Sequence, residues 1–278
     1  MSQVIKEATV NAAHPTLSST VVLFHSLNIL AFVLVLTVLI TAILAKNLHR
    51  VGAWYTFLCI QLLFVITFLF YPFKSSNFSP AFVPCLLQAI LVYAIPPAAN
   101  WGLLALVLEV YALIQTTATG PSNQKLRFFL FGLPITIFIG EALVVLIVGL
   151  KYPSAIGMQP DALFCHLKST KLPGIVDAVV YLIPIIVSIA LFCLLGLKAY
   201  TYSRRLRVER VSVNSSFPPL SILRIVVLLL APIFVFCCAF QQYTLLVKLS
   251  NFLPLVPILT AIAFGTQKDM ISALLTWR

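Results

Sequence analysis

The sequence predicts an all-α integral membrane protein built as a bundle of seven transmembrane helices. Of its 278 residues, 61% are hydrophobic and only 9% are charged, whereas soluble domains carry about 25% charged residues. Apolar runs of about 20 residues, long enough to cross a bilayer, follow one another with short polar breaks. The 18 Lys and Arg residues fall in those breaks. This pattern encodes membrane topology and lacks the basic stripe, interleaved with aromatic residues, that binds nucleic acid.

The chain divides into an N-terminal tail (1–19), the helical bundle (20–265) and a C-terminal amphipathic helix (266–278). Within the bundle we expect spans at about 20–45, 52–72, 84–116, 127–150, 174–198, 221–242 and 246–265. The last two crossings share a short stretch. A six-span alternative, with both termini on one side, therefore stays open.

Charge and sequons favour an N-terminus outside the cell and a C-terminus inside. In this orientation twelve of the 18 Lys and Arg residues are cytoplasmic and six are exterior, as the positive-inside rule requires. Asn77-Phe78-Ser79 then lies in an outer loop, so we expect glycosylation at Asn77.

The third span, from Cys85 to Gln115, organises the rest of the chain. The helical rise carries it about 36 Å from Cys85 to Glu109, slightly more than a bilayer core of about 30 Å. Of six cysteines, only Cys85 and Cys165 fall at the outer face. A disulfide between them is allowed because the exterior is oxidising, and two unrelated thiols are the alternative.

Several polar side chains could line a ligand pocket at the outer half of the bundle. Helical steps of three and four from Cys85 bring a stripe toward the bundle centre: Gln88, Val92, Tyr93, Pro96, Asn100 and Trp101. Gln241, Gln242 and Tyr243 lie at the outer end of the sixth span. Together they predict a mostly apolar pocket with a few polar anchors. Interhelical packing and hydrogen bonding are the alternative.

Ionisable residues at membrane depth are costly and mark functional sites by default. Glu141, the deepest, could contact ligand or tie neighbouring helices together. Asp177 lies nearer the outer interface, where a solvated carboxylate is the simpler interpretation. Glu109 lies at the inner edge, within reach of cytoplasmic Arg residues, and could form a switchable ion pair.

Enzymatic motifs are missing from the sequence. The four His residues are scattered singly, without a His-Glu-x-x-His pair or a Cys/His cluster of zinc-ligand spacing. No Ser sits in a nucleophile elbow. We therefore expect no enzyme, no catalytic residue, no bound metal and no cofactor.

Two cytoplasmic segments could meet partners. The loop after the fifth span, LKAYTYSRRLRVERVSVNSSFPPL, carries Arg204, Arg205 and Arg207, which would attract anionic membrane lipid or dock an acidic protein. After Gly265, Met270, Ile271, Leu274 and Trp277 share one face of a short helix that would lie along the inner membrane surface.

This layout resembles rhodopsin-like (class A) G-protein-coupled receptors. Glu109-Val110-Tyr111 stands where those receptors carry an acidic-Arg-Tyr triplet, although Val110 replaces the Arg. Pro184, Pro232 and Pro257 resemble the prolines of the fifth, sixth and seventh helices, and would act as hinges. The segments PCLLQAILVYAIPPAA and FGTQKD are similar in texture to uncharacterised seven-transmembrane receptors of mushroom-type (basidiomycete) fungi.

The resemblance implies a multi-pass receptor of the plasma membrane. An extracellular ligand would bind among the pocket residues. Glu109, Val110 and Tyr111, with Arg204, Arg205 and Arg207, would switch or contact a heterotrimeric G protein. The alternative is a small seven-helix transporter or channel that uses Glu141 as its intramembrane carboxylate. The sequence names neither the ligand nor the oligomeric state.

Overall fold

The computed structural model describes residues 19–45, 50–69, 81–119, 124–157, 164–167, 179–194, 196–197 and 253–275. These residues are almost entirely helical, as expected of the all-α class. The elements in chain order are α2 (Ser19–Leu44), α3 (Gly52–Phe68), α4 (Phe82–Thr119), α5 (Gln124–Lys151), the 3-10 turn η1 (Pro153–Ala155), β1 (Ile156–Gly157), β2 (His166–Leu167), α9 (Leu255–Gly265) and α10 (Lys268–Leu275). A further apolar helix covers Val179–Leu194; it is called the 179–194 helix below.

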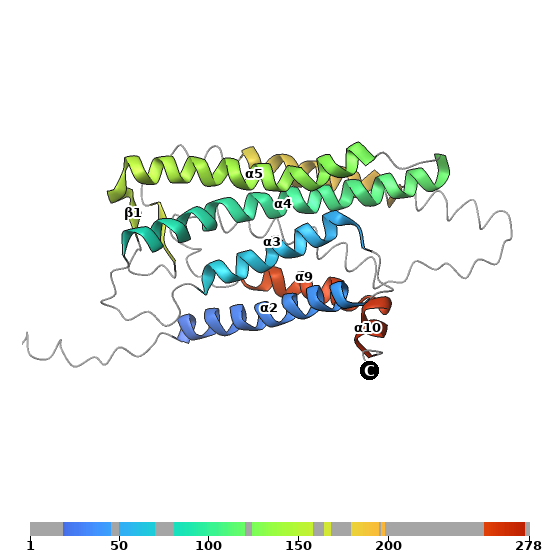
Figure 1. Cartoon of the computed structure of the whole chain (residues 1–278), viewed down its shortest axis with the longest axis horizontal. Helices are drawn as coiled ribbons and strands as arrows, with labels where there is room; N and C mark the ends of the chain where they lie inside the picture. The colour runs from blue at the N-terminus through green and yellow to red at the C-terminus, as the bar shows by residue number, and fades with distance from the viewer. Residues whose placement is uncertain are drawn as a thin grey trace, which may run out of the picture.

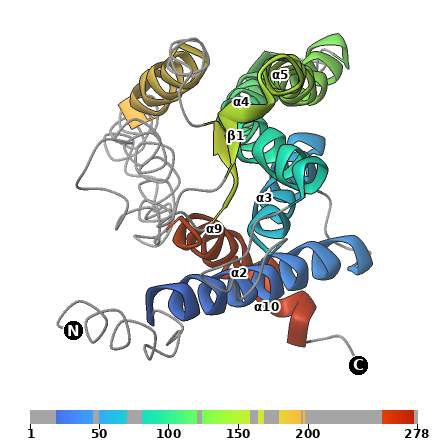
Figure 2. The ribbon, with the colours of Figure 1, turned by 90° about the vertical axis from the view of Figure 1, so that its left-hand side faces the viewer.

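Helices α4 and α5 lie side by side along the long axis of the molecule (Figure 1), whereas α2 is inclined to them (Figure 2). The β1–β2 pair lies at one end of the bundle and α10 at the other; we call these the hairpin end and the α10 end. Seen along the axis in Figure 2, α4 lies between α5 and α3, while α2 lies against α9. The first described helix thus packs on the helix near the end of the chain.

Three of the described helices are long and apolar enough to cross a membrane: Val21–Leu44, Phe82–Glu109 and Gln124–Lys151. The helices Gly52–Phe68, Val179–Leu194 and Leu255–Gly265 are apolar but shorter. A helix satisfies its own backbone groups, which lipid cannot do. Large apolar side chains such as Ile43, Val33 and Ile147 are more than half exposed, as expected where the surface meets lipid. The chain is therefore a membrane protein.

Most of the expected spans overlap helices of the structure. Helices α2, α3, α4, α5 and the 179–194 helix fall where the spans 20–45, 52–72, 84–116, 127–150 and 174–198 were expected. The span 221–242 and the first part of 246–265 lie outside the described residues. The later part of 246–265 is α9, and α10 falls within 266–278.

The two largest apolar clusters of the described residues lie toward opposite ends of the bundle. Toward the α10 end, side chains of α2, α3, α4 and α9 gather around Phe57 and Phe264, and Met270 of α10 packs into the same cluster. Toward the hairpin end, Phe24, Phe68 and Tyr181 come together from α2, α3 and the 179–194 helix. Because lipid tails are as apolar as these side chains, close packing rather than escape from water holds the helices.

Gly149 of α5 allows a close approach between α5, α4 and β1. A Cβ atom placed on Gly149 of α5 would lie 2.6 Å from Leu86 Cδ1 of α4 and 2.6 Å from Ile156 Cδ1 of β1. A side chain at this position would require the ends of Leu86 and Ile156 to shift. The glycine therefore lets α5 meet α4 and β1 at the hairpin end.

Candidate functional site

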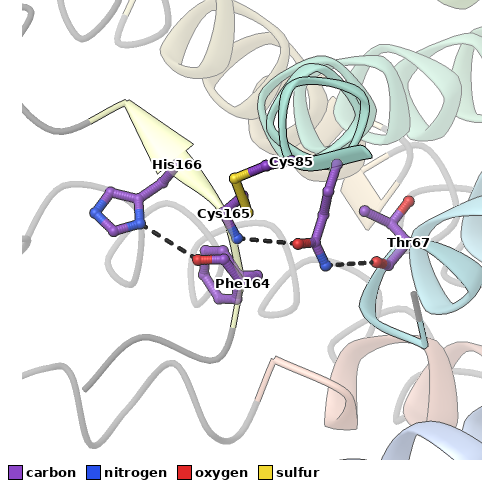
Figure 3. The surroundings of a disulfide bond; sticks show 6 residues. Thr67, Cys85, Phe164, Cys165 and His166 are labelled. Atoms are coloured by element: carbon purple, nitrogen blue, oxygen red, sulfur yellow. Dashed lines mark hydrogen bonds between the residues drawn. A yellow bond between two sulfur atoms is a disulfide. The ribbon is translucent and has the colours of Figure 1, made fainter. Parts of the chain in front are cut away.

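A disulfide joins Cys85, near the start of α4, to Cys165, just before β2, as predicted. The two Cα atoms are 5.4 Å apart, and 80 residues of sequence separate them. Strands β1 and β2 pair antiparallel, with Ile156 opposite Leu167. The bond and the strand pair together fix the described part of the connection after α5 against the head of α4 (Figure 3).

Gln88, a predicted pocket residue, ties three elements together beside this disulfide. It is fully buried. Its Nε2 donates to the carbonyl of Thr67 in α3 at 3.1 Å, and its Oε1 accepts the backbone N–H of Cys165 at 3.0 Å (Figure 3). One side chain thus satisfies a helix carbonyl and a loop amide. Both ends of its amide group serve the protein's own backbone.

Phe164, just before β2, packs against the apolar cluster of Phe24, Phe68 and Tyr181. Its ring meets the ring of Phe68 edge-on, with centroids 5.2 Å apart. Phe68 in turn meets Phe24 of α2 at 5.5 Å in the same geometry. Edge-to-face contacts of this kind stabilise by about 0.5–1.5 kcal/mol beyond the area they bury. A series of aromatic contacts therefore links Phe164 to α2.

Two other predicted pocket residues of α4, Val92 and Tyr93, pack against different clusters. Val92 is partly buried against the cluster of Phe24 and Phe68, whereas Tyr93 packs against the cluster around the disulfide. Consecutive residues on a helix point in directions about 100° apart, so they do not share one surface. Val92 and Tyr93 thus contact different clusters, and the pocket stays a prediction because Gln241, Gln242 and Tyr243 lie outside the described residues.

Trp101 bonds a carbonyl that a proline leaves without its helical partner. In a regular helix the carbonyl of Val180 would accept the N–H of residue 184, but Pro184 has none. Trp101 Nε1 of α4 donates to this carbonyl at 3.1 Å. The predicted hinge at Pro184 is therefore tied to α4, in the way that neighbouring helices satisfy proline kinks in membranes. Pro257, the other described hinge residue, is buried in α9.

Glu109 caps the start of α3. Its side chain is 6% exposed, and Oε2 accepts the backbone N–H of Ala53 at 3.2 Å. The residue before the helix, Val51, offers no side-chain cap, so Glu109 bonds an amide that α3 does not satisfy itself. A carboxylate there also complements the positive end of the helix dipole. The carboxylate thereby fastens the far part of α4 to α3.

A second polar contact lies at the α10 end. Arg50 Nη2 and Asp269 Oδ2, from the segment before α3 and from α10, are 2.6 Å apart. The guanidinium also lies over the Trp54 ring, 5.7 Å from its centroid. Trp54 meets Phe264 of α9 edge-on at 5.6 Å. These contacts hold α10 against the start of α3.

Glu141 is buried, at 6% exposure, on a stripe of α5 that also carries Leu130, Pro134, Val145 and Gly149. This stripe faces α4, the helix against which α5 mainly packs. The carboxylate lies between helices and not toward lipid, as its cost in lipid demands.

Several predicted residues lie outside the described residues: Asn77, Asp177, Arg204, Arg205, Arg207, Pro232, Gln241, Gln242 and Tyr243. Val110 and Tyr111 continue α4 after Glu109, and Tyr111 is half-buried. Among the described parts of the chain, no three His, Cys, Asp or Glu side chains lie close enough to hold a metal ion.

The sequence did not predict the contacts made by Arg50, Ala53, Phe164 and Asp269. Arg50 and Asp269 stand alone at helix boundaries far apart in sequence, so only the packing of α10 reveals their pairing. Phe164 carried a usable signal, because it directly precedes the outer cysteine Cys165. Ala53 acts through its backbone, which no side-chain pattern reports.

Comparison with known proteins adds no family assignment. No protein-family model matches the chain, and no curated protein matches it.

Proposed function

We propose that this chain is a seven-helix receptor of the G-protein-coupled type, which carries an extracellular ligand signal to a heterotrimeric G protein. The observation that supports it best is the Cys85–Cys165 disulfide, which fixes a hairpin across one end of the bundle. At the opposite end, α10 follows α9 and packs against it. One end is suited to ligand access and the other to a protein partner.

The same disulfide supports the proposed orientation. Disulfides persist in oxidising compartments and are rare in the cytosol. The hairpin end would therefore face the cell exterior, with the N-terminus, and the α10 end would face the cytosol. Seven spans and a location in the plasma membrane belong to this proposal.

Signalling would use the bond between Glu109 and α3. Ligand bound at the outer half would favour one of two helix packings, and the inner ends would present a changed surface. The Glu109 carboxylate holds α4 to the start of α3 in the packing described above. Release of that bond would accompany activation, while Val110, Tyr111 and the basic residues Arg204, Arg205 and Arg207 would contact the G protein.

Agonist-independent nucleotide exchange on a co-expressed G protein tests this function. Neutralising the SRRLR segment should abolish exchange. Glu109→Gln keeps an oxygen that can accept the Ala53 N–H but removes the charge that favours the helix N-terminus, so it should raise basal exchange. Glu141→Gln is the matched control, because it makes the same chemical change on α5. Equal exchange in the intact chain and all three variants would contradict the proposal.

The buried Glu141 supports a second candidate, a small transporter or channel. A carboxylate held between α5 and α4 at 6% exposure could bind a proton or a cationic substrate. Reconstituted protein would then mediate proton or cation flux in liposomes, and Glu141→Gln would abolish that flux. Flux that survives this substitution would dismiss Glu141 as the transport residue.

A further inference from the structure

Three buried polar atoms at the α10 end have no hydrogen-bond partner among the described residues. They are Nε of Arg50, the indole Nε1 of Trp54 and Oε1 of Gln267. Trp54 is only 3% exposed. Buried polar groups in native proteins are almost always bonded to protein or to ordered water. Three such atoms in one region therefore point to a partner that the described residues do not supply.

The three side chains belong to one junction. Arg50 pairs with Asp269 at 2.6 Å through Nη2, and its guanidinium lies over the Trp54 ring. Trp54 packs on Phe264, and the backbone N–H of Gln267 donates to the Phe264 carbonyl at 3.3 Å. Contacts thus run without a break from the segment before α3 to the α9–α10 connection.

The balance of donors and acceptors identifies the missing partner. Arg50 Nε and Trp54 Nε1 can only donate, and Gln267 Oε1 can only accept. An anion would suit the two donors but would face the Gln267 oxygen and the Asp269 carboxylate. A metal ion would suit those oxygens but would meet the guanidinium.

Water matches the hydrogen-bonding needs of all three atoms, because one molecule accepts two hydrogen bonds and donates two. We propose that this junction is a binding site for ordered water, which accepts from Arg50 and Trp54 and donates to Gln267. Buried waters commonly make about three hydrogen bonds to groups that are otherwise unsatisfied.

The water would fix how α10 sits on the bundle. The Arg50–Asp269 pair is partly exposed, at 19% and 50% for the two side chains, and exposed ion pairs contribute little. Met270 anchors α10 by packing alone. Hydrogen bonds through water would add direction to that packing. This role depends only on the junction, so it holds whether or not the chain is a receptor.

A structure of the full chain in lipid nanodiscs, at a resolution that reveals water, tests the site directly. We expect a solvent peak about 2.7–3.2 Å from both Trp54 Nε1 and Gln267 Oε1. A site without density, or one filled by a tetrahedral group, would overturn the proposal.

A thermal-unfolding cycle tests it independently. Trp54→Phe removes the donor but keeps a ring under Arg50, and Gln267→Met removes the acceptor at similar volume. Each should lower the apparent Tm by about 2–4 °C. The double variant should lose clearly less than the sum, because the second change removes a partner of water already displaced. Additive losses would overturn the proposal.

Two controls complete the test. Trp101→Phe combined with Gln267→Met makes the same chemical changes, but Trp101 bonds Val180 on the 179–194 helix; these losses should add. Replacing chloride by phosphate at constant ionic strength should leave the apparent Tm of the intact chain unchanged. A rise in phosphate that Arg50→Gln abolishes would assign the junction to an anion and overturn the water site.

Discussion

The bond between Trp101 and Val180 allows a sharp test of how the bundle satisfies a proline. In the native chain Trp101 supplies the hydrogen bond that Pro184 cannot. Trp101→Phe keeps most of the ring but leaves the Val180 carbonyl without this donor. Hydrogen bonds between membrane helices are worth about 0.6 kcal/mol on average and at most about 1.7. The substitution should therefore shift the unfolding equilibrium by about 3- to 20-fold through the lost bond alone.

The proline provides the matched background. In Pro184→Ala, residue 184 regains an N–H that can donate to the Val180 carbonyl, so the indole becomes dispensable there. The packing cost of the smaller ring is the same in both backgrounds and cancels in the cycle. In unfolding measurements on purified protein in bicelles, Trp101→Phe should lower the free energy of unfolding by about 0.6–1.7 kcal/mol less when residue 184 is Ala than when it is Pro. An equal cost in both backgrounds would refute this account.

Three further predictions concern packing and polar contacts, and the same unfolding measurement checks each. Gln88→Leu should lower the free energy of unfolding by about 2–6 kcal/mol, because it leaves one buried N–H and one buried carbonyl unsatisfied, each at about 1–3 kcal/mol. A loss below about 1 kcal/mol would mean that the Gln88 amide does not hold these elements together. Gly149→Val should destabilise the protein more than Gly132→Val does, because a Cβ at Gly149 would lie 2.6 Å from the ends of Leu86 and Ile156, whereas one at Gly132 meets nothing within 4 Å. Equal effects of the two substitutions would contradict the close approach. Asp269→Asn should lower the free energy of unfolding by at most about 1 kcal/mol, because the ion pair between Asp269 and Arg50 is partly exposed. A larger loss would contradict the view that this pair contributes little.

The sequence predicted features that depend on the membrane itself. Apolar length predicts helices because lipid offers no partner for backbone groups, and α2, α4 and α5 have that length. The disulfide followed from the placement of Cys85 and Cys165 at one face. Both inferences use position along a span, which the sequence displays directly.

The partners of the polar side chains were not predictable in the same way. The helical stripe placed Gln88 and Trp101 toward the bundle, but their acceptors are backbone carbonyls of Thr67 and Val180. Any residue can supply a carbonyl, so no sequence pattern marks it. Glu109 accepts the backbone N–H of Ala53 in α3, a contact that the sequence did not predict, and its expected ion pair with an Arg stays a prediction. Such contacts depend on the rotation of one helix against another, which short-range periodicity does not determine.

The packing of α2 on α9 has a consequence for how the chain is made. Val35 and Val38 of α2 share a cluster with Ala261 and Phe264 of α9, and a Cβ on Gly265 would lie 3.0 Å from Val38 Cγ2. Helix α2 is synthesised before α3, α4 and α5, whereas its partner α9 follows only after them. Until then, lipid or a chaperone must cover that face. A nascent chain that stops before α9 would hold α2 with this face uncovered, which would expose the chain to quality control.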